Sequence, residues 1–252
     1  MRFNSDQIQK IGKEISSKVD GKTLFDEFSR GRYSTDASVY QIKPLGVVLP
    51  KDTNDVLSLM EYSQKNSVPL LARGGGSSQC GQTVGESVVL DYSKHQNKIL
   101  ELNVEEKYVW VQPGVVLDHL NAYLKPHGLW FPVDVSTSSR ATIGGMSANN
   151  SCGSRSLYYG NMVHNVLAIE AILDDGSIFN FDQINKNYLA TKNNQDRLYK
   201  IIDKFIDVRK QVGGEIDNNW PTTQRRVGGY NIDLIDPEGF NSSNLLVGSE
   251  GT

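Results

Sequence analysis

The chain has 252 residues, of which 38% are hydrophobic and 22% charged, as in an ordinary globular protein that buries a large core. A net charge of −3 and a pI near 5.8 argue against a nucleic-acid partner, which normally shows a clustered basic excess. No apolar run approaches the roughly 20 residues needed to span a bilayer, and the first residues lack the apolar region of a secretory signal. We therefore expect a cytoplasmic protein without a transmembrane segment.

The N-terminal residues predict an amphipathic helix. Ile8, Ile11, Ile15 and Val19 recur at helical spacing, so one face of this helix can pack on the body of the protein. We expect residues 1–35 to form a helical extension with a structural role.

A strand–helix–strand unit is predicted next. Its strands are Val47–Leu49 and Val68–Ala72, and its helix runs from about Asn54 to Gln64, with Asp52 or Thr53 as the N-cap. Such a unit implies parallel strands joined by a right-handed crossover.

Shorter elements are expected after Asp91. Strands are predicted near Ile99–Leu102 and Tyr108–Gln112, and a helix from Leu117 to Lys125 is ended by Pro126. Val166–Leu173 and Ser177–Phe181, joined by an Asp-Gly turn, predict an antiparallel hairpin.

A glycine-rich segment, PLLARGGGSSQCGQ at 69–82, follows the second predicted strand. Without a Cβ, consecutive glycines let backbone N–H groups point the same way and approach a ligand closely. The N–H groups of Gly74 to Ser78 could hold a pyrophosphate, with the hydroxyls of Ser77 and Ser78 as added donors. The alternative is a tight turn between two strands. Arg73 either contacts a phosphate or braces the loop through backbone carbonyls.

This segment does not match the two common phosphate-binding loops. The dinucleotide pattern G-x-G-x-x-G needs a glycine at Gln79. A P-loop needs a lysine at Gln82 and a helix after it, whereas residues 85–91 read as a turn and a strand. Neither an ordinary Rossmann site nor a nucleoside triphosphate site is therefore expected.

A second glycine-rich segment, ATIGGMSANNSCGS at 141–154, predicts a short helix from Thr142 through Asn150. The N-terminus of a helix offers unpaired N–H groups and a partial positive charge, so it can bind an anion. The alternative for the polar residues that follow is a cap and turn at the end of the helix.

The cysteines and histidines indicate no disulfide or metal site. Cys80 and Cys152 lie in the two glycine-rich loops and could meet, but without an export signal we expect small, buried, reduced thiols. The four histidines show no paired ligand spacing, so no metal is predicted.

Several strings, in fixed order, resemble one family. They are RGGGSSQCGQ at 73–82, VQPG at 111–114, WFPVD at 130–134, ATIGG at 141–145, NNSCGS at 149–154, YG at 159–160 and GSEGT at 248–252. They are similar to the FAD-binding domain of vanillyl-alcohol-oxidase (PCMH) type flavoproteins. They look most like bacterial D-2-hydroxy acid dehydrogenases, the group of flavin-linked D-lactate dehydrogenases and the FAD subunit of glycolate oxidase. The resemblance extends from about Tyr33 to the last residue.

The resemblance implies an α+β fold with two α/β lobes. Residues 36–252 would form the FAD-binding domain, with a small parallel-stranded lobe at about 36–100, a larger mostly antiparallel lobe at about 101–252, and FAD between them. FAD is expected to be non-covalent, because the histidine that tethers flavin in some members is missing from the first loop. A C-terminal substrate (cap) domain is expected to be absent, so that the chain is a truncated and poorly active fragment.

Cofactor contacts are implied around both glycine-rich segments. Trp130 to Pro132 could form a flavin wall, although aromatic clusters are more often core. The predicted cofactor-binding residues are Arg73, Gly74, Gly75, Gly76, Ser77, Ser78, Gly81, Gln82, Asp134, Thr142, Gly144, Gly145, Asn149, Ser151, Gly153, Ser156, Gly160 and Val166.

The implied reaction is hydride transfer from C2 of a D-2-hydroxy acid, such as lactate, glycolate or 2-hydroxyglutarate, to flavin N5. Electrons would then pass to a quinone, a cytochrome or an iron–sulfur domain, and the full-length form could dock peripherally at the inner face of the membrane. Arg225, Arg226 and Tyr230 are weak candidates for facing the substrate carboxylate, against a surface or lobe-bridging role. The alternatives are a non-catalytic FAD-carrying subunit and an NADPH-dependent flavin reductase of the same fold.

Overall fold

The computed structural model describes residues 3–191 and 196–251, which form two compact units. The first unit comprises the described residues of 1–131, 136–145 and 174–176, and the second those of 132–135, 146–173 and 177–252. The boundary between the two expected lobes, at about 36–100 and 101–252, lies earlier in the chain than the boundary between these units. The lobe boundaries stay a prediction.

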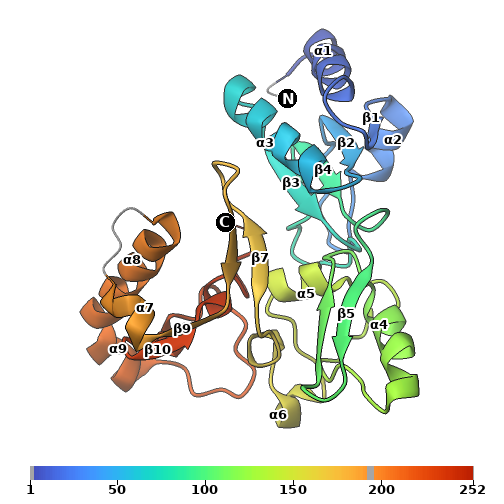
Figure 1. The fold of residues 1–252 in the computed structure, drawn as a ribbon. Helices are drawn as coiled ribbons and strands as arrows, with labels where there is room; N and C mark the ends of the chain where they lie inside the picture. Colours follow the sequence, from blue (N-terminus) through green and yellow to red (C-terminus); the bar gives the residue numbers. More distant parts are fainter. Residues whose placement is uncertain (1–2, 192–195, 252) are drawn as a thin grey trace. The chain divides into compact units, whose positions relative to one another are not determined.

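A four-stranded sheet with the order β1-β2-β4-β3 forms the centre of the first unit (Figure 1). Strands β2, β4 and β3 are parallel, and β1 pairs with β2 in antiparallel orientation. The two strands of the predicted strand–helix–strand unit are parallel as expected, but β4 lies between them. The strands are β1 Lys22–Leu24, β2 Gly46–Leu49, β3 Leu70–Arg73 and β4 Val88–Asp91.

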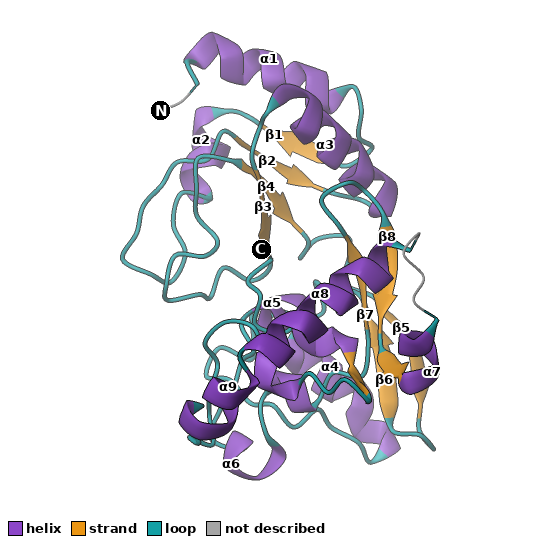
Figure 2. Ribbon diagram, turned by 90° about the vertical axis from the view of Figure 1, so that its left-hand side faces the viewer, coloured by secondary structure: helices purple, strands orange, loops and turns teal. Residues whose placement is uncertain are grey.

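The helices of this unit are α1 Ser5–Ser16, α2 Glu27–Arg32 and α3 Thr53–Asn66. Helix α1 buries its isoleucine face as predicted, although Val19 lies beyond its end. The Tyr62 hydroxyl of α3 donates to Glu14 of α1 at 2.6 Å, and the two helices lie side by side (Figure 2). The ring of Phe25 fills the space beside Gly12 and Gly46, where an added Cβ would lie 2.7 and 2.2 Å from it. Strand β1, within the expected helical extension, was not predicted from the sequence.

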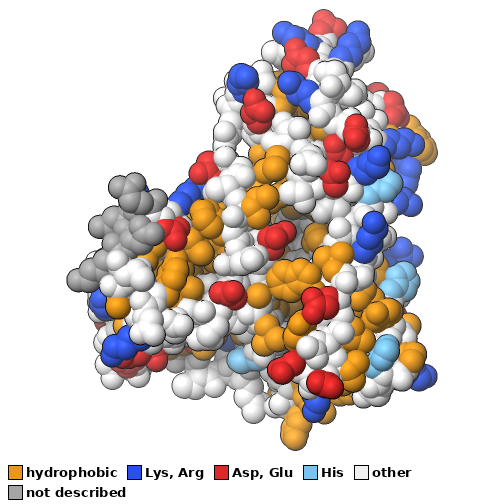
Figure 3. Space-filling view, in the orientation of Figure 1, with side chains coloured by type: hydrophobic (Ala, Val, Ile, Leu, Met, Phe, Trp, Pro, Cys, Tyr) orange, Lys and Arg blue, Asp and Glu red, His pale blue; other side chains and the backbone are white. Residues whose placement is uncertain are grey.

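A hairpin and a helix complete the first unit. Strands β5 Ile99–Asn103 and β6 Tyr108–Val111 pair in antiparallel orientation, as predicted. Helix α4, Leu117–Leu124, ends before Pro126 and continues into the 3₁₀ turn Lys125–His127. On the face in Figure 3, hydrophobic side chains gather over this region, and Lys and Arg alternate with Asp and Glu over α1 and α3. The buried core here is formed by Val115, Leu120 and Leu124.

The second unit contains antiparallel strand pairs and short helices. Strands β7 Ile169–Ile172 and β8 Ile178–Phe181 form the predicted hairpin, and β9 Gln183–Asn185 pairs with β10 Gly239–Asn241. Its core is built mainly by α8, which buries Leu198, Ile202 and Ile206 against Phe181 and Phe240. The helices are α5 Ile143–Ala148, which begins in the first unit, α6 Ser156–Tyr159, α7 Lys186–Ala190, α8 Arg197–Gln211 and α9 Gly213–Asn219, with 3₁₀ turns at Met162–His164, Ile232–Leu234 and Ser242–Leu245.

Within residues 3–191 and 196–251, no helix has both the length and the apolar character that crossing a membrane requires.

One buried carboxylate ties the N-terminal extension to the sheet. Asp55 lies in the first turn of α3, one turn after the N-cap Asp52, and is 4% exposed. Its oxygens accept from the backbone N–H groups of Asp20, Gly21 and Lys51 at 2.7, 2.9 and 2.7 Å. A carboxylate can accept several such bonds, and these are stronger than bonds between neutral groups. Asp55 therefore fixes where the chain enters β1 and leaves β2.

We predict that Asp55→Asn lowers the free energy of unfolding by about 1–3 kcal/mol, because an amide group would turn a donor toward buried donors. Urea unfolding followed by circular dichroism measures the change. Glu105→Gln, at an exposed turn position, makes the same chemical change outside this cluster and should leave stability within about 0.5 kcal/mol of wild type. Equal stabilities of the two variants would contradict the anchoring role of Asp55.

Candidate functional site

The first glycine-rich loop leaves the carboxyl end of β3 and offers a row of unused donors. Within residues 3–191 and 196–251, the backbone N–H groups of Gly74, Gly75, Gly76, Ser77 and Ser78 donate no hydrogen bond to a protein acceptor. Successive main-chain N–H groups in a turn conformation can form a concave anion site. The loop thus offers main-chain donors to a ligand.

Close backbone contacts explain why this loop needs glycine. A Cβ on Gly75 would lie 2.2 Å from the carbonyl oxygen of Arg140, a main-chain atom that cannot swing away. Gly76 has φ +64°, which side chains rarely adopt. The loop backbone is therefore in close contact with residue 140. Its glycines have no side chains that could cover the N–H donors.

Arg73 braces this loop. Its guanidinium donates to the carbonyl oxygens of Thr35 at 2.9 Å, Thr83 at 3.2 Å and Tyr33 at 3.5 Å, and it stacks 5.2 Å from the centre of the Tyr33 ring. Burial lowers the pKa of Arg73, while the carboxylate of Asp91 acts to raise it, and an arginine remains charged at neutral pH. These contacts agree with the alternative in which Arg73 braces the loop through backbone carbonyls. A direct contact between Arg73 and the cofactor stays a prediction.

The remaining predicted residues of this loop have local partners. The Ser78 hydroxyl accepts from the N–H of Cys80 at 3.3 Å, and the Tyr40 ring packs on Gly81, where an added Cβ would lie 2.6 Å from it. Gln82 is half-buried.

Cys80 and Cys152 are both free thiols, as expected, but Cys80 is exposed and Cys152 is half-buried, so the prediction of buried thiols was wrong. Among the described residues, no cluster of His, Cys, Asp or Glu is arranged to hold a metal ion.

The N-terminus of α5 does not present the unpaired donors that the sequence suggested. The N–H of Ile143 donates to Val115 O at 2.8 Å, that of Gly144 to Pro113 O at 2.9 Å, and that of Gly145 to the buried Thr142 hydroxyl at 3.4 Å. The expectation that these three amides are unpaired was wrong, because loop carbonyls and a capping hydroxyl accept their hydrogen bonds. Thr142, Gly144 and Gly145 as other kinds of cofactor contact stay predictions.

In the second unit, the predicted polar residues bind one another. Asp134 accepts from the Ser154 hydroxyl at 2.7 Å and the Arg155 N–H at 2.9 Å. The buried Ser156 hydroxyl accepts from the N–H of Gly153 at 3.0 Å. A Cβ on Gly153 would lie 1.7 Å from the carbonyl oxygen of Asp134, so these two backbones are in contact. Residues 153–156 thus form a turn fastened to Asp134.

The other predicted contacts of this unit are also engaged. The Asn149 amide donates to both carboxylate oxygens of Glu250 at 2.7 and 2.9 Å, and the N–H of Ser151 donates to Met146 O at 2.9 Å. Gly160 has φ +75°, next to the His164 ring. The carbonyl of Val166 accepts from Asn241 at 3.0 Å. These bonds match the cap-and-turn alternative, and the cofactor role of these residues stays a prediction.

The three substrate candidates already have contacts within the second unit. Arg226 forms an ion pair with Asp233 at 2.6 Å and stacks 5.0 Å from the Trp220 ring. Arg225 donates to the carbonyl of Gly153 at 3.2 Å, and the Tyr230 ring lies 5.7 Å from that of Phe205. The charge of Arg226 is therefore balanced by a neighbouring carboxylate.

An asparagine network in the second unit was missed in the sequence. Asn150 is fully buried with φ +48°, accepts from the Val163 N–H at 3.0 Å and donates to Asn231 at 3.3 Å. Asn231 in turn donates to Val247 O at 2.7 Å, which fixes the segment before Gly248. The available signal was an asparagine at a helix end, since asparagine tolerates left-handed backbone there.

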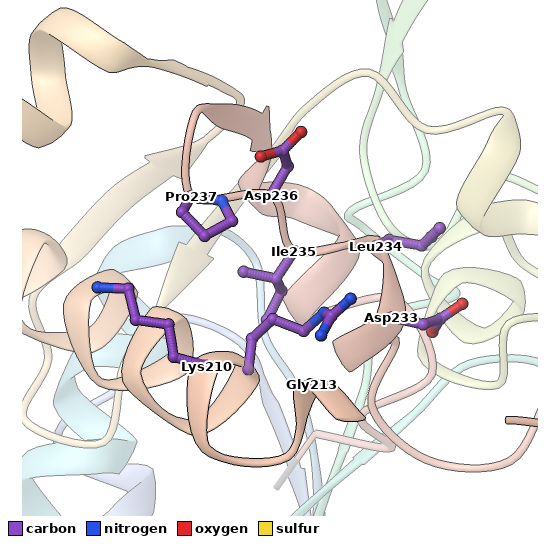
Figure 4. A pocket seen from close by; sticks show the side chains of 8 residues that line it. Lys210, Gly213, Asp233, Leu234, Ile235, Asp236 and Pro237 are labelled. Atoms are coloured by element: carbon purple, nitrogen blue, oxygen red, sulfur yellow. The ribbon is translucent and has the colours of Figure 1, made fainter. Parts of the chain in front are cut away.

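A cavity of about 480 Å³ in the second unit contains none of the predicted residues (Figure 4). It is lined by α8, the N-terminus of α9 and residues 233–237, and Arg209 at its wall is paired with Asp217 at 3.0 Å. The side chains of Lys210 and Asp236 point away from the cavity in Figure 4. The cavity therefore brings together none of the residues predicted to bind the cofactor.

Known proteins resemble this chain in sequence. The sequence model of the family described as FAD binding domain matches residues 44–182. D-2-hydroxyglutarate dehydrogenase of Haemophilus influenzae is 35% identical over 232 residues, covering 87% of this chain and 22% of that protein, and the Escherichia coli enzyme is 35% identical over 242 residues, covering 92% and 24%. Glycolate oxidase subunit GlcD of Bacillus subtilis is 37% identical over 176 residues, covering 68% and 37%.

Solved structures show the fold. Alkyldihydroxyacetonephosphate synthase matches with a TM-score of 0.59 and 21% identity over 66% of this chain and 33% of that chain. The Physcomitrella patens BBE-like 1 protein matches with a TM-score of 0.60 and 21% identity over 71% and 39%. The expected α+β fold of this type is thereby confirmed. The chain spans 22% to 24% of the D-2-hydroxyglutarate dehydrogenases that it resembles.

The environment of Asp134 predicts a pH-dependent contribution to stability. Burial acts to raise the pKa of Asp134, but the hydrogen bonds from Ser154 and Arg155 outweigh it, so the net pKa lies below the ordinary value. A lowered folded-state pKa stabilises the fold above the unfolded-state pKa of about 3.9, and this stabilisation is lost as the pH falls through the folded-state pKa.

We expect Asp134→Asn to lower the free energy of unfolding by up to about 1 kcal/mol at pH 7, and the difference from wild type to shrink at pH 3. Urea unfolding at the two pH values measures it. Asp182→Asn makes the same change at an exposed position outside this turn and serves as the control. A difference for Asp134→Asn that stays the same at both pH values would contradict the charge-assisted role.

Proposed function

Because the chain belongs to the FAD binding domain family, we propose that its first glycine-rich loop holds the pyrophosphate of a dissociable FAD. The observation that carries this proposal is the row of unpartnered N–H groups from Gly74 to Ser78. These donors and the Ser77 hydroxyl would bind phosphate oxygens, while Arg73 holds the loop in shape from behind. Residues 74–82 include no histidine, which supports a non-covalent cofactor.

We further propose that the protein acts as an FAD-dependent oxidoreductase on a D-2-hydroxy acid. Bound FAD supplies an acceptor for the hydride from C2 of such a substrate. The D-2-hydroxyglutarate dehydrogenases match 87% to 94% of this chain, whereas the glycolate oxidase subunit and the D-lactate dehydrogenases match 54% to 68%. This difference favours D-2-hydroxyglutarate as the first substrate to test, ahead of lactate and glycolate. The electron acceptor would be a separate quinone, cytochrome or iron–sulfur domain.

A second candidate function is an FAD-carrying unit whose catalytic groups lie elsewhere. It is favoured by the Arg226–Asp233 ion pair, because a cation that is already paired attracts a substrate carboxylate less strongly. Arg225, Arg226 and Tyr230 therefore remain weak candidates for substrate binding.

The cofactor proposal predicts that Gly75→Ala loses FAD. The added Cβ would meet the Arg140 carbonyl at 2.2 Å and displace the donors. We expect FAD affinity to fall at least about tenfold, corresponding to about 1.4 kcal/mol. The matched control Gly31→Ala places a methyl group where no atom lies within 4 Å, and it should bind FAD as wild type does.

Binding is measured by titrating apoprotein with FAD and following the visible flavin spectrum. Acid precipitation then shows whether FAD is released into the supernatant, as expected for a non-covalent cofactor. A wild-type protein that folds and stays colourless with excess FAD would overturn the proposal. Flavin that stays with the acid precipitate would overturn its non-covalent part.

The substrate proposal predicts that D-2-hydroxyglutarate bleaches the flavin absorbance of the intact enzyme under anaerobic conditions. D-lactate and glycolate should reduce it more slowly, and L-2-hydroxyglutarate should not reduce it. Stopped-flow absorbance measures the rates. Flavin that no 2-hydroxy acid reduces would favour the FAD-carrying alternative, and stoichiometric reduction by NADPH would instead favour a flavin reductase.

A further inference from the structure

Residues 33–42, here called the strap, lie along the glycine loop. The strap leaves α2, and it is closed at its base by the bond from the Ile42 N–H to Ser34 O at 2.8 Å. Figure 2 shows loops extending together from the sheet beside α2. The N–H of Ala37 in the strap donates to Gly76 O at 3.2 Å, and the Thr83 hydroxyl donates to Asp36 at 3.0 Å. The strap therefore contacts both the donor-rich part of the loop and its far end.

The bond from Ala37 controls the direction of a cofactor donor. In a trans peptide the carbonyl of one residue and the N–H of the next point in opposite directions. Because Ala37 holds the carbonyl of Gly76, the N–H of Ser77 is turned away from Ala37. The strap thus orients a donor without contacting the ligand.

Arg73 connects the strap to the loop. It donates to Tyr33 and Thr35 in the strap and to Thr83 in the loop, so one guanidinium holds both segments. The base of the strap is fixed to the sheet as well, because the Tyr33 hydroxyl donates to Asp91 at 2.7 Å. The tip has fewer contacts, since Val39 is 94% exposed and Tyr40, whose ring packs on Gly81, is 53% exposed. Segments with few buried contacts open locally while the rest of the fold stays intact.

We propose that the strap is a latch on the phosphate-binding loop and that Arg73 is its positioning residue, so that opening of the strap sets how fast FAD leaves. This inference rests on the proposed function. It concerns the stability of the loop in the empty protein as well as cofactor release, so it can be observed with and without FAD.

The main test is Thr83→Val, which removes the bond to Asp36 at nearly constant volume. It leaves the backbone N–H groups from Gly74 to Ser78 in place. FAD release should become about 2- to 12-fold faster, the factor given by the loss of one hydrogen bond of typical net strength. Arg73→Lys, which keeps the charge but not the planar fork, should accelerate release further. Thr222→Val makes the same change as the main variant at an exposed position and should not alter release.

Release is followed by the fluorescence of free FAD after dilution, and hydrogen exchange of residues 36–40 is measured in the apoproteins. Both variants should speed exchange there while leaving β4 protected. Wild-type protein that binds no FAD would overturn the proposed function and the latch with it. Wild-type protein that binds FAD while Thr83→Val releases it at the rate of Thr222→Val would overturn the latch alone. If Arg73→Lys fails to fold, Thr83→Val decides the question.

Discussion

The placement of β4 between β2 and β3 is the constraint on which the rest of the first unit depends. Val88 and Val89 of this strand are fully buried, and the three strands run parallel. Parallel neighbours cannot be joined by a tight turn, because the chain must return from the carboxyl edge of the sheet to its amino edge. Helix α3 makes this return between β2 and β3. Between β3 and β4 the glycine loop makes it.

That role explains both the length of the glycine loop and its fastenings. A connection without a helix lacks the regular internal hydrogen bonds of a helix, so most of its carbonyl and N–H groups need other partners. Arg73 and Ala37 satisfy carbonyls at residues 83 and 76 of this segment, whereas the N–H groups from 74 to 78 are left without protein acceptors in the described ranges. The loop is thus held on its carbonyl side and available on its donor side. This asymmetry is the physical basis of the proposed phosphate site.

Near the second glycine-rich segment, residue types that predict ligand contacts have hydrogen-bond partners within the protein. A helix that opens with Thr-Ile-Gly-Gly reads as an anion site, yet Pro113 and Val115 supply carbonyls to its first amides. Asp134 is predicted to contact the cofactor, and its carboxylate accepts hydrogen bonds from Ser154 and Arg155. These partners are distant in sequence, so no local pattern reveals them. The Asp233 carboxylate that balances Arg226 lies only seven residues away, but no regular helix or strand spacing joins the two.

The sequence by itself determined the local elements and the family. Apolar periodicity predicted α1, a capping residue the start of α3, a proline the end of α4 and an Asp-Gly turn the β7–β8 hairpin. The resemblance of several short strings in fixed order indicated the family. Only the tertiary structure decided which donors are available. It placed β4 inside the strand–helix–strand unit, added β1 to the sheet edge, turned Arg73 toward the strap and satisfied the amides of α5. Whether an N–H group is free depends on acceptors brought from elsewhere in the chain, and only folding brings them there.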